Sequence, residues 1–163
     1  MASKFWPELM KGYEKLFESK EYYDVIIQAG EEPNVQEIYA HSLILRRSDY
    51  FRSNLREKRG DGKFIFKISN IPPKTLENIF RFLYCGKIDL SVEAVDILTL
   101  LTTANEFELE SLVVHIQEFL IDNQKDFIKN NVTKFLDDNI FESNNFKLIR
   151  NYCLEIIPDT PND

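Results

Sequence analysis

Cysteine and histidine are scarce in this chain, which has two of each among its 163 residues. Zinc sites are built from closely spaced Cys and His side chains, and no such spacing joins Cys85, Cys153, His41 and His115. A chain of this length buries about 68–70% of its unfolded surface, so it needs neither disulfides nor metals to fold. We expect two buried thiols, an intracellular protein and no metal or other cofactor.

Long apolar runs are missing as well. No segment approaches the ~20 residues that span a bilayer. Residues 1–15 are charged and interrupted by Pro7 and Gly12, unlike a secretory signal peptide. We therefore expect a cytoplasmic or nuclear protein that has no membrane partner.

Positive charge is in deficit, because 27 acidic residues outnumber 20 basic ones and leave a net charge of −7. Non-specific nucleic-acid binding needs clustered Lys and Arg side chains that meet phosphates. The basic cluster within residues 46–59 is interleaved with Asp49 and Glu57. We interpret it as the solvated face and end of a helix, and we predict no nucleic-acid partner.

Catalytic motifs are absent too, since the chain has no nucleophile elbow, phosphate-binding loop or dinucleotide-binding glycine pattern. Cys85 precedes Gly86 at the predicted end of a helix, away from the helix N-termini that activate thiolates. Asp24 lies among apolar neighbours in a predicted strand, either as a catalytic acid or as an anchor for nearby donors. Because no catalytic constellation surrounds either residue, we predict that the chain is not an enzyme.

The patterns that are present alternate between strand and helix. Runs of β-branched and aromatic residues predict strands at residues 22–28, 35–40 and 63–68. The first two should form a hairpin around a turn that contains Gly30 and Pro33. Apolar stripes predict helices between Pro72 and Gly86, beyond Ser91, and as a pair over 124–157. The expected fold class is α+β, with a short mixed sheet, a helical core and an appended C-terminal helical hairpin.

Residues 40–51 are the centre of the predicted core. They begin as the end of a strand and should turn into one helix with apolar residues on both sides, which indicates a buried position. Four of them recur at spaced positions, namely His41, Leu45, Ser48 and Phe51. We interpret His41 as a structural residue at the start of this helix, not as a catalytic one.

Residues 1–20 contain a predicted amphipathic helix whose first turn accommodates Pro7. Its apolar side chains form one stripe, made of Trp6, Leu9, Tyr13 and Phe17. Gly12 weakens this helix by about 1 kcal/mol relative to alanine, so packing must stabilise it. The pattern leaves open whether the helix packs on its own domain or on a second copy.

The stretch 40–51 resembles the A-H-x-x-x-L-x-x-S-x-x-F segment of the BTB/POZ domain. Other pieces are similar in order and spacing: the strand residues 23–25, the turn 84–86 and the helical segment 100–120. In that segment the matching residues are Leu101, Ala104, Leu109, Leu112 and Phe119. The resemblance covers about residues 20–123, and the opening FWPEL with YDVIIQAGE is similar to BTB proteins of fungi.

This resemblance implies a BTB/POZ fold, in which a three-stranded sheet caps a cluster of helices. It also implies four parts: a dimerisation helix at 1–20, the BTB/POZ domain at 21–123, a BACK-like helical extension at 124–157 and a tail at 158–163. The family is a dimerisation and adaptor module, so we expect a homodimer. The residues expected at its interface are Trp6, Leu9, Tyr13, Phe17 and Asp24.

Many BTB/POZ proteins bind the N-terminal region of cullin-3 and recruit substrates to a ubiquitin ligase, and a helical extension is usual among them. The residues that the resemblance suggests for this contact are Leu55, Glu57, Tyr84, Asn105 and Phe107. An apolar side chain beside a carboxylate would supply desolvation and register. The competing hypothesis is a self-association module of a larger protein without a ligase role, which the incomplete cullin-binding motif around Leu55 favours.

Ser42 departs from the pattern of the family's transcription factors, which carry a basic residue at this position. That basic residue pairs with the strand aspartate, so Asp24 is predicted to lack its expected partner. The departure argues against the charged pocket that binds co-repressors.

Overall fold

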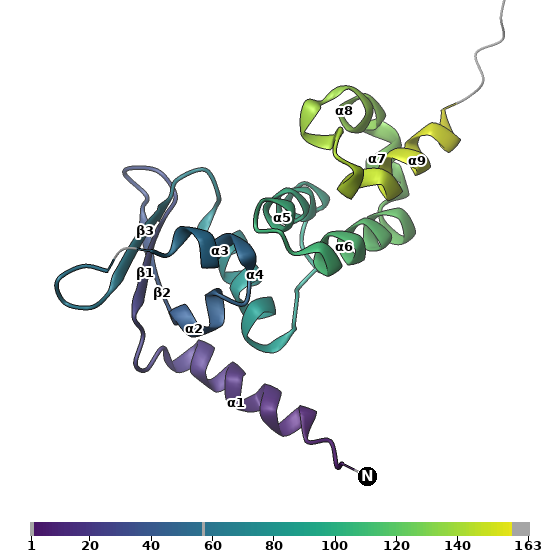
Figure 1. The fold of residues 1–163 in the computed structure, drawn as a ribbon. Helices are drawn as coiled ribbons and strands as arrows, with labels where there is room; N and C mark the ends of the chain where they lie inside the picture. The colour runs from purple at the N-terminus through teal and green to yellow at the C-terminus, as the bar shows by residue number, and fades with distance from the viewer. Residues whose placement is uncertain (1, 57, 158–163) are drawn as a thin grey trace, which may run out of the picture. The chain divides into compact units, whose positions relative to one another are not determined.

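The computed structural model describes residues 2–56 and 58–157, and the chain divides into two compact units between Ser91 and Val92. The described elements of the first unit are, in chain order, α1 (Trp6–Ser19), β1 (Val25–Ala29), β2 (Gln36–Ala40), α2 (Ser42–Leu45), α3 (Asp49–Asn54), β3 (Phe64–Ile68) and α4 (Pro73–Cys85) (Figure 1).

The sheet of the first unit has the strand order β2-β1-β3. β1 runs antiparallel to β2, with Val25 opposite Ala40, and parallel to β3, with Val25 opposite Phe64. Four of the five β1 residues are buried, which is expected of a central strand. The predicted hairpin and mixed sheet are confirmed, although β1 begins three residues later than predicted, so that Asp24 immediately precedes the strand.

Residues 40–51, the central stretch, contribute to two short helices, α2 and α3, so the prediction of a single helix was wrong. Ser48, which precedes α3, has an extended backbone with φ −84° and ψ 132°, and this interrupts the helical path after α2. Ile44, Leu45 and Phe51 are buried, but Leu43 is 82% exposed. The stretch therefore contributes to the core from one side of α2, and not from both sides as predicted.

Helix α4 is the buried helix of the first unit. It begins at Pro73 and ends before Gly86, whose φ of +72° is the left-handed conformation that glycine adopts at low cost. Its buried residues are Thr75, Leu76, Ile79, Phe80, Leu83, Tyr84 and Cys85. The Phe80 ring lies 5.8 Å from the Phe51 ring, centroid to centroid, in an edge-to-face contact. This packing connects α4 to the central stretch.

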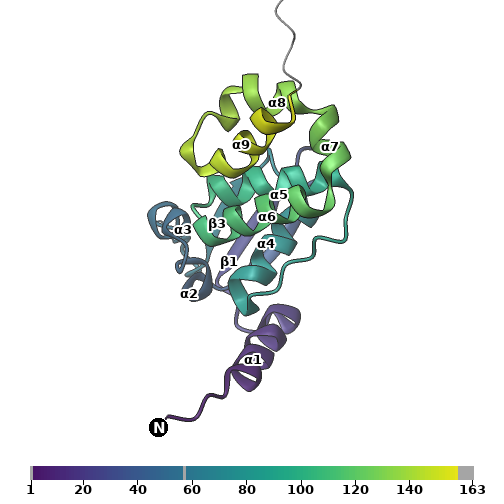
Figure 2. The ribbon, with the colours of Figure 1, turned by 90° about the vertical axis from the view of Figure 1, so that its right-hand side faces the viewer.

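The described part of the second unit is entirely helical. Its elements are α5 (Ala94–Glu106), α6 (Glu110–Asn123), α7 (Lys125–Asn130), α8 (Val132–Asp137), the 3₁₀ turns η1 (Asn139–Phe141) and η2 (Asn144–Phe146), and α9 (Lys147–Ile156). α7 and α9 pack on α6, and α8 packs on α9 (Figure 2). Gln117 of α6 is fully buried and links α6 to η2 and α9, because its amide donates to Asn145 O at 2.7 Å and accepts from Ile149 N at 3.2 Å.

The predicted C-terminal hairpin differs from the structure in its first half. Instead of one helix, the chain forms α7, α8 and η1, with a break at Asn131. The Asn131 amide donates to Phe127 O at 2.8 Å, a local side-chain bond that competes with helix continuation. Helix α5 also begins at Ala94 and not directly after Ser91, whose hydroxyl instead donates to Asp89.

Candidate interaction surfaces

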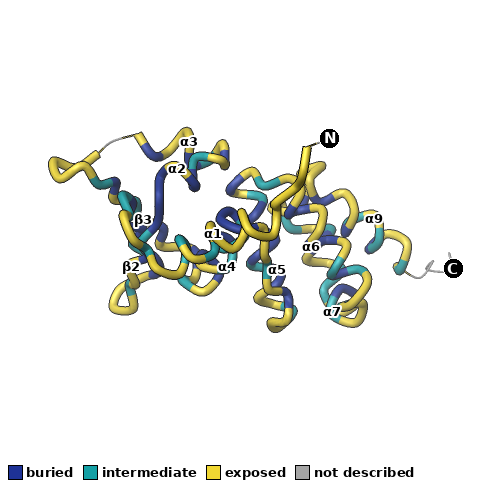
Figure 3. The backbone as a smooth tube through the Cα atoms, turned by 90° about the horizontal axis from the view of Figure 1, so that it is seen from below, coloured by how far each residue is buried: buried dark blue, intermediate teal, exposed yellow. Residues whose placement is uncertain are grey.

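Helix α1 presents a large apolar surface to solvent. None of its residues is buried, and Figure 3 shows it exposed over most of its length. Trp6 is 59% exposed and Leu9 is 50% exposed. We define the apolar face of α1 as the exposed Trp6 together with the apolar side chains that line one concavity of the helix surface: Phe5, Leu9, Tyr13 and Leu16. Phe5 was missed in the sequence, although its spacing of four from Leu9 is the helical signal that would have found it.

This apolar face is hollowed. Gly12 lies beside Leu9 and Tyr13 in the wall of an open concavity, and no atom lies within 4 Å of the place where a Cβ on Gly12 would stand. Glu8 is the one charged residue that lines the concavity. The surface is thus mostly apolar, concave and open, and its lining residues belong to α1 or directly precede it.

The opposite face of α1 packs on α4 through rings and charges. The Phe17 ring meets the Tyr84 ring edge-on at 5.2 Å between centroids, and the Arg81 guanidinium lies 4.9 Å from the Phe17 centroid. Phe17 was predicted at the dimer interface, but these contacts place it on the face that adjoins its own domain. Its role in a dimer stays a prediction.

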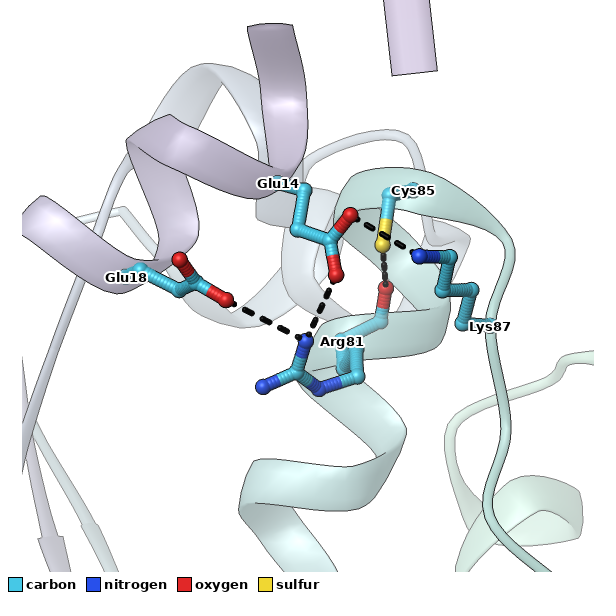
Figure 4. Close-up of polar contacts among 5 residues, drawn as sticks. All are labelled: Glu14, Glu18, Arg81, Cys85 and Lys87. Atoms are coloured by element: carbon cyan, nitrogen blue, oxygen red, sulfur yellow. Dashed lines mark hydrogen bonds and ion pairs between the residues drawn. The ribbon is translucent and has the colours of Figure 1, made fainter. Parts of the chain in front are cut away.

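Glu14 joins this second face to α4 and to the segment directly after it by two ion pairs, which Figure 4 shows. Its carboxylate accepts from Arg81 Nη1 at 3.1 Å and from Lys87 Nζ at 2.8 Å. Glu18 lies 3.8 Å from the same Arg81 nitrogen. The hydrogen bond from Lys87 lowers the pKa of the Glu14 carboxyl, so the group is ionised at neutral pH. The Cys85 thiol shown beside them donates to Arg81 O and takes no part in the ion pairs.

Asp24 is held by Ser42 and not by a basic side chain, which agrees with the anchor interpretation of the sequence. Its carboxylate accepts from the Ser42 backbone N–H at 2.7 Å and from the Ser42 hydroxyl at 2.5 Å. Ser42 therefore stands where the transcription-factor pattern has a basic residue, and it offers Asp24 two neutral donors in place of a positive charge. The half-buried carboxylate holds the first turn of α2 against the start of β1, which supports a structural anchor. Leu43, directly after Ser42, adds an exposed apolar side chain that the sequence had assigned to the core.

His41 also has a structural role, in agreement with its interpretation from the sequence. Its Nε2 lies 2.6 Å from Glu21 O, which only accepts hydrogen bonds, so Nε2 carries the proton. In the neutral ring Nδ1 then accepts from the Tyr84 hydroxyl at 2.5 Å, while the His41 backbone N–H donates to that hydroxyl at 2.9 Å. Burial raises the pKa of Tyr84, so its hydroxyl stays protonated and can donate.

The residues suggested for cullin-3 binding lie mostly inside the protein. Leu55 is 2% exposed, Tyr84 is 3% exposed and Phe107 has no exposed surface. Asn105 is half-buried and accepts from the Asn145 side chain at 2.8 Å. Glu57 lies outside the described residues. As the structure stands, the three buried side chains pack in the protein interior, and only Asn105 among the described candidates presents surface to a partner.

The described residues show neither a metal-binding cluster nor a bilayer-spanning element. No group of three or more His, Cys, Asp and Glu side chains among them could hold a metal ion. No helix in residues 2–56 or 58–157 has the length and apolar character to cross a membrane. Both cysteines are buried and free, and burial raises the pKa of the Cys153 thiol.

Comparison with solved structures finds a matching fold. The chain is similar to the BTB domain of zebrafish PATZ1, with a TM-score of 0.60 and 24% sequence identity, over 76% of this chain and 97% of that one. At this level of identity the likeness shows the fold alone, and it confirms the α+β prediction with its three-stranded sheet. No curated protein sequence matches the chain.

The model of the BTB/POZ domain family matches residues 13–124, which is more than half of the chain. The match begins within α1 and runs past the end of α6, so it includes the sheet, the central stretch and α4. The chain therefore belongs to the BTB/POZ family, whose domains are protein–protein interaction modules.

Proposed function

We propose that this chain is a homodimeric interaction module whose two copies meet through the apolar face of α1. The observation that carries the proposal is the exposure of Phe5, Trp6 and Leu9, at 69%, 59% and 50%. A contiguous apolar surface of this kind on a globular domain marks an interaction site. Gly12 lowers the helix propensity of α1 and no α1 residue is buried, so contact with a partner would also supply packing that α1 lacks in the single chain.

A two-fold dimer is the simplest arrangement for such a surface. In a two-fold interface the same patch of both copies meets, so each exposed ring would be covered by the equivalent patch of the other copy. The concavity beside Gly12 would receive a side chain of the partner's α1. Leu43 and the Asp24–Ser42 pair would lie close to this interface if it continues from α1 along the start of β1 and α2, as the sequence prediction for Asp24 requires.

A cullin-3 adaptor is the second candidate function. It is supported by the helices α7, α8 and α9, which follow the matched BTB region as the extension of such adaptors does, and by the accessible side of Asn105. The burial of Leu55, Tyr84 and Phe107 weighs against direct contact by these side chains. The alternative remains a self-association module of a larger protein with no role in a ubiquitin ligase.

Light scattering of the purified chain, alone and with the N-terminal fragment of cullin-3, tests both candidates. We expect the mass of a dimer for the chain alone at micromolar concentration. A stable complex of two chains with two cullin fragments supports the adaptor. A dimer that ignores cullin-3 leaves self-association as the function, and a chain that stays monomeric contradicts the proposed homodimer.

A further inference from the structure

Helix α1 contacts its own domain through ion pairs as well as through ring contacts. No side chain of α1 is buried. Phe17 of α1 makes an edge-on ring contact with Tyr84 of α4. The Glu14 carboxylate, 23% exposed, uses both oxygens on two different cations. Arg81 lies in the middle of this arrangement, since it contacts Glu14, Glu18 and the Phe17 ring together.

The two cations come from positions that are fixed by the buried helix. Arg81 is within α4, one turn before Tyr84, and its side chain is 35% exposed. Lys87 follows Gly86, whose left-handed backbone turns the chain at the end of α4. Glu14 therefore binds to two points separated along the end of a rigid element, and this fixes both the rotation of α1 and its place along α4. Figure 4 shows Glu14 between the two basic side chains.

We propose that the Glu14 clamp, made by Glu14, Arg81 and Lys87, positions α1 for self-association and so sets the affinity of the homodimer. None of the three residues belongs to the apolar face, so their effect is exerted through the orientation of α1. The inference rests on the proposed homodimer and adds its regulation by charge. A helix that is free to rotate must lose that freedom on binding, and the clamp removes this entropic cost in advance.

The clamp makes a distinctive prediction about salt. Its charges are partly exposed, so dissolved ions screen them, over a Debye length of about 10 Å at 0.1 M and about 3 Å at 1 M. Screening of the clamp should loosen α1 and so weaken the dimer. Salt also screens the repulsion between two chains that each carry a net charge of −7, and this second effect should strengthen the dimer. The contribution of the clamp is therefore measured as the ratio of the dimer dissociation constants of a variant without the clamp and the wild type.

The variant Glu14→Gln removes the charge and keeps the size of the side chain. Sedimentation equilibrium should show a dimer dissociation constant raised about threefold to tenfold, because two exposed ion pairs are lost in each of the two copies. Lys87→Gln should act in the same direction, and the double variant should be less than additive, since both changes break one contact. Glu31→Gln, in the turn after β1, changes the charge equally at an exposed residue and should leave the constant unchanged.

The same experiment repeated from about 0.05 M to 1 M salt separates a positioning role from a general structural one. The ratio of the dissociation constants of Glu14→Gln and wild type should fall toward one as the salt concentration rises, while the ratio for Glu31→Gln stays constant. If wild type and Glu14→Gln dimerise equally at low salt, the clamp is refuted although the homodimer stands. If the wild type shows no dimer at any concentration, the proposed function itself fails.

Discussion

Helices α1 and α4 have nearly the same length and contact each other, yet they differ completely in burial. α4 spans 13 residues and buries seven of them, whereas α1 spans 14 residues and buries none. Both carry apolar stripes at helical spacing, so composition does not separate them. The difference is that the stripe of α4 faces the core of its own chain, while the apolar face of α1 faces solvent.

This difference separates the residues that stabilise the folded single chain from the residues that are available to stabilise a dimer. Residues of α4 should determine the free energy of unfolding of a single chain, whereas residues of the apolar face of α1 should determine the dimer alone. Tyr84 and Arg81 connect the two roles, because they belong to α4 and contact Phe17 of α1. Substitutions in the two helices can therefore test the separation directly.

The largest effect on folding is expected from Phe80→Ala in α4. Phe80 is fully buried and contacts Phe51, so truncation removes apolar burial and leaves a cavity in the core. The free energy of unfolding should fall by about 3–5 kcal/mol in urea titrations of the dilute chain. Tyr22→Ala removes an aromatic ring that is 93% exposed and is the matched control, with an expected change within about 0.5 kcal/mol. Similar losses for both variants would contradict the assignment of Phe80 to the core.

Tyr84→Phe in α4 should have the next largest effect. It deletes a hydroxyl that accepts from the His41 backbone N–H and donates to the His41 ring, and so leaves buried polar groups without partners. We expect a loss of about 1–3 kcal/mol in the free energy of unfolding. The ring remains, so its contact with Phe17 and the dimer mass should be retained. A neutral result would show that the His41 network contributes no stability.

Smaller effects, opposite in sign to each other, are expected at Gly86, which follows the end of α4, and at Gly12 within α1. Gly86→Ala forces a side chain into a left-handed backbone with φ +72° and should lower the melting temperature, at a cost of about 1–2 kcal/mol. Gly12→Ala adds a Cβ that meets no atom within 4 Å in the single chain, and should stabilise α1 by about 1 kcal/mol. Calorimetry for the first and amide exchange of α1 for the second measure the two changes. Effects of the same sign would contradict the described backbone of one of the helices.

The smallest effect on folding is expected from Leu9→Ala in α1. Leu9 is 50% exposed in the single chain, so the free energy of unfolding of the dilute monomer should change by less than about 0.5 kcal/mol. The same variant should weaken the dimer, because it removes apolar surface from the interface. If Leu9→Ala destabilises the dilute chain as strongly as Phe80→Ala, α1 belongs to the core and the comparison fails.

Much of the fold could be predicted because local residue chemistry specifies it. Prolines can start a helix and Gly86 can end one, and β-branched runs around a Gly- and Pro-containing turn specify a hairpin. The spaced residues of the central stretch, together with Asp24 and the 84–86 turn, then indicated the family. These features depend on sequence neighbours or on a pattern that the whole family shares.

What could not be predicted depends on which neighbours come close in space. Leu43 and Ile44 are both apolar, and their neighbouring positions on α2 point one to solvent and the other to the core, which depends on how α2 packs. Tyr84 was suggested as a surface residue because the sequence does not show that its hydroxyl meets His41, 43 residues earlier. The Glu14 clamp was missed for the same reason, since Arg81 is 67 residues away and its pairing with Glu14 follows from the docking of α1 on α4.

The most direct test of the α1 interface is the mass of Tyr13→Asp by light scattering, measured beside the wild type. Tyr13 lies in the apolar face and is 37% exposed in the single chain, so an aspartate there leaves the fold intact but would bury an unpaired charge in the dimer. We predict a dimer for the wild type and a folded monomer for Tyr13→Asp at the same micromolar concentration. A Tyr13→Asp chain that remains a dimer would contradict the α1 interface.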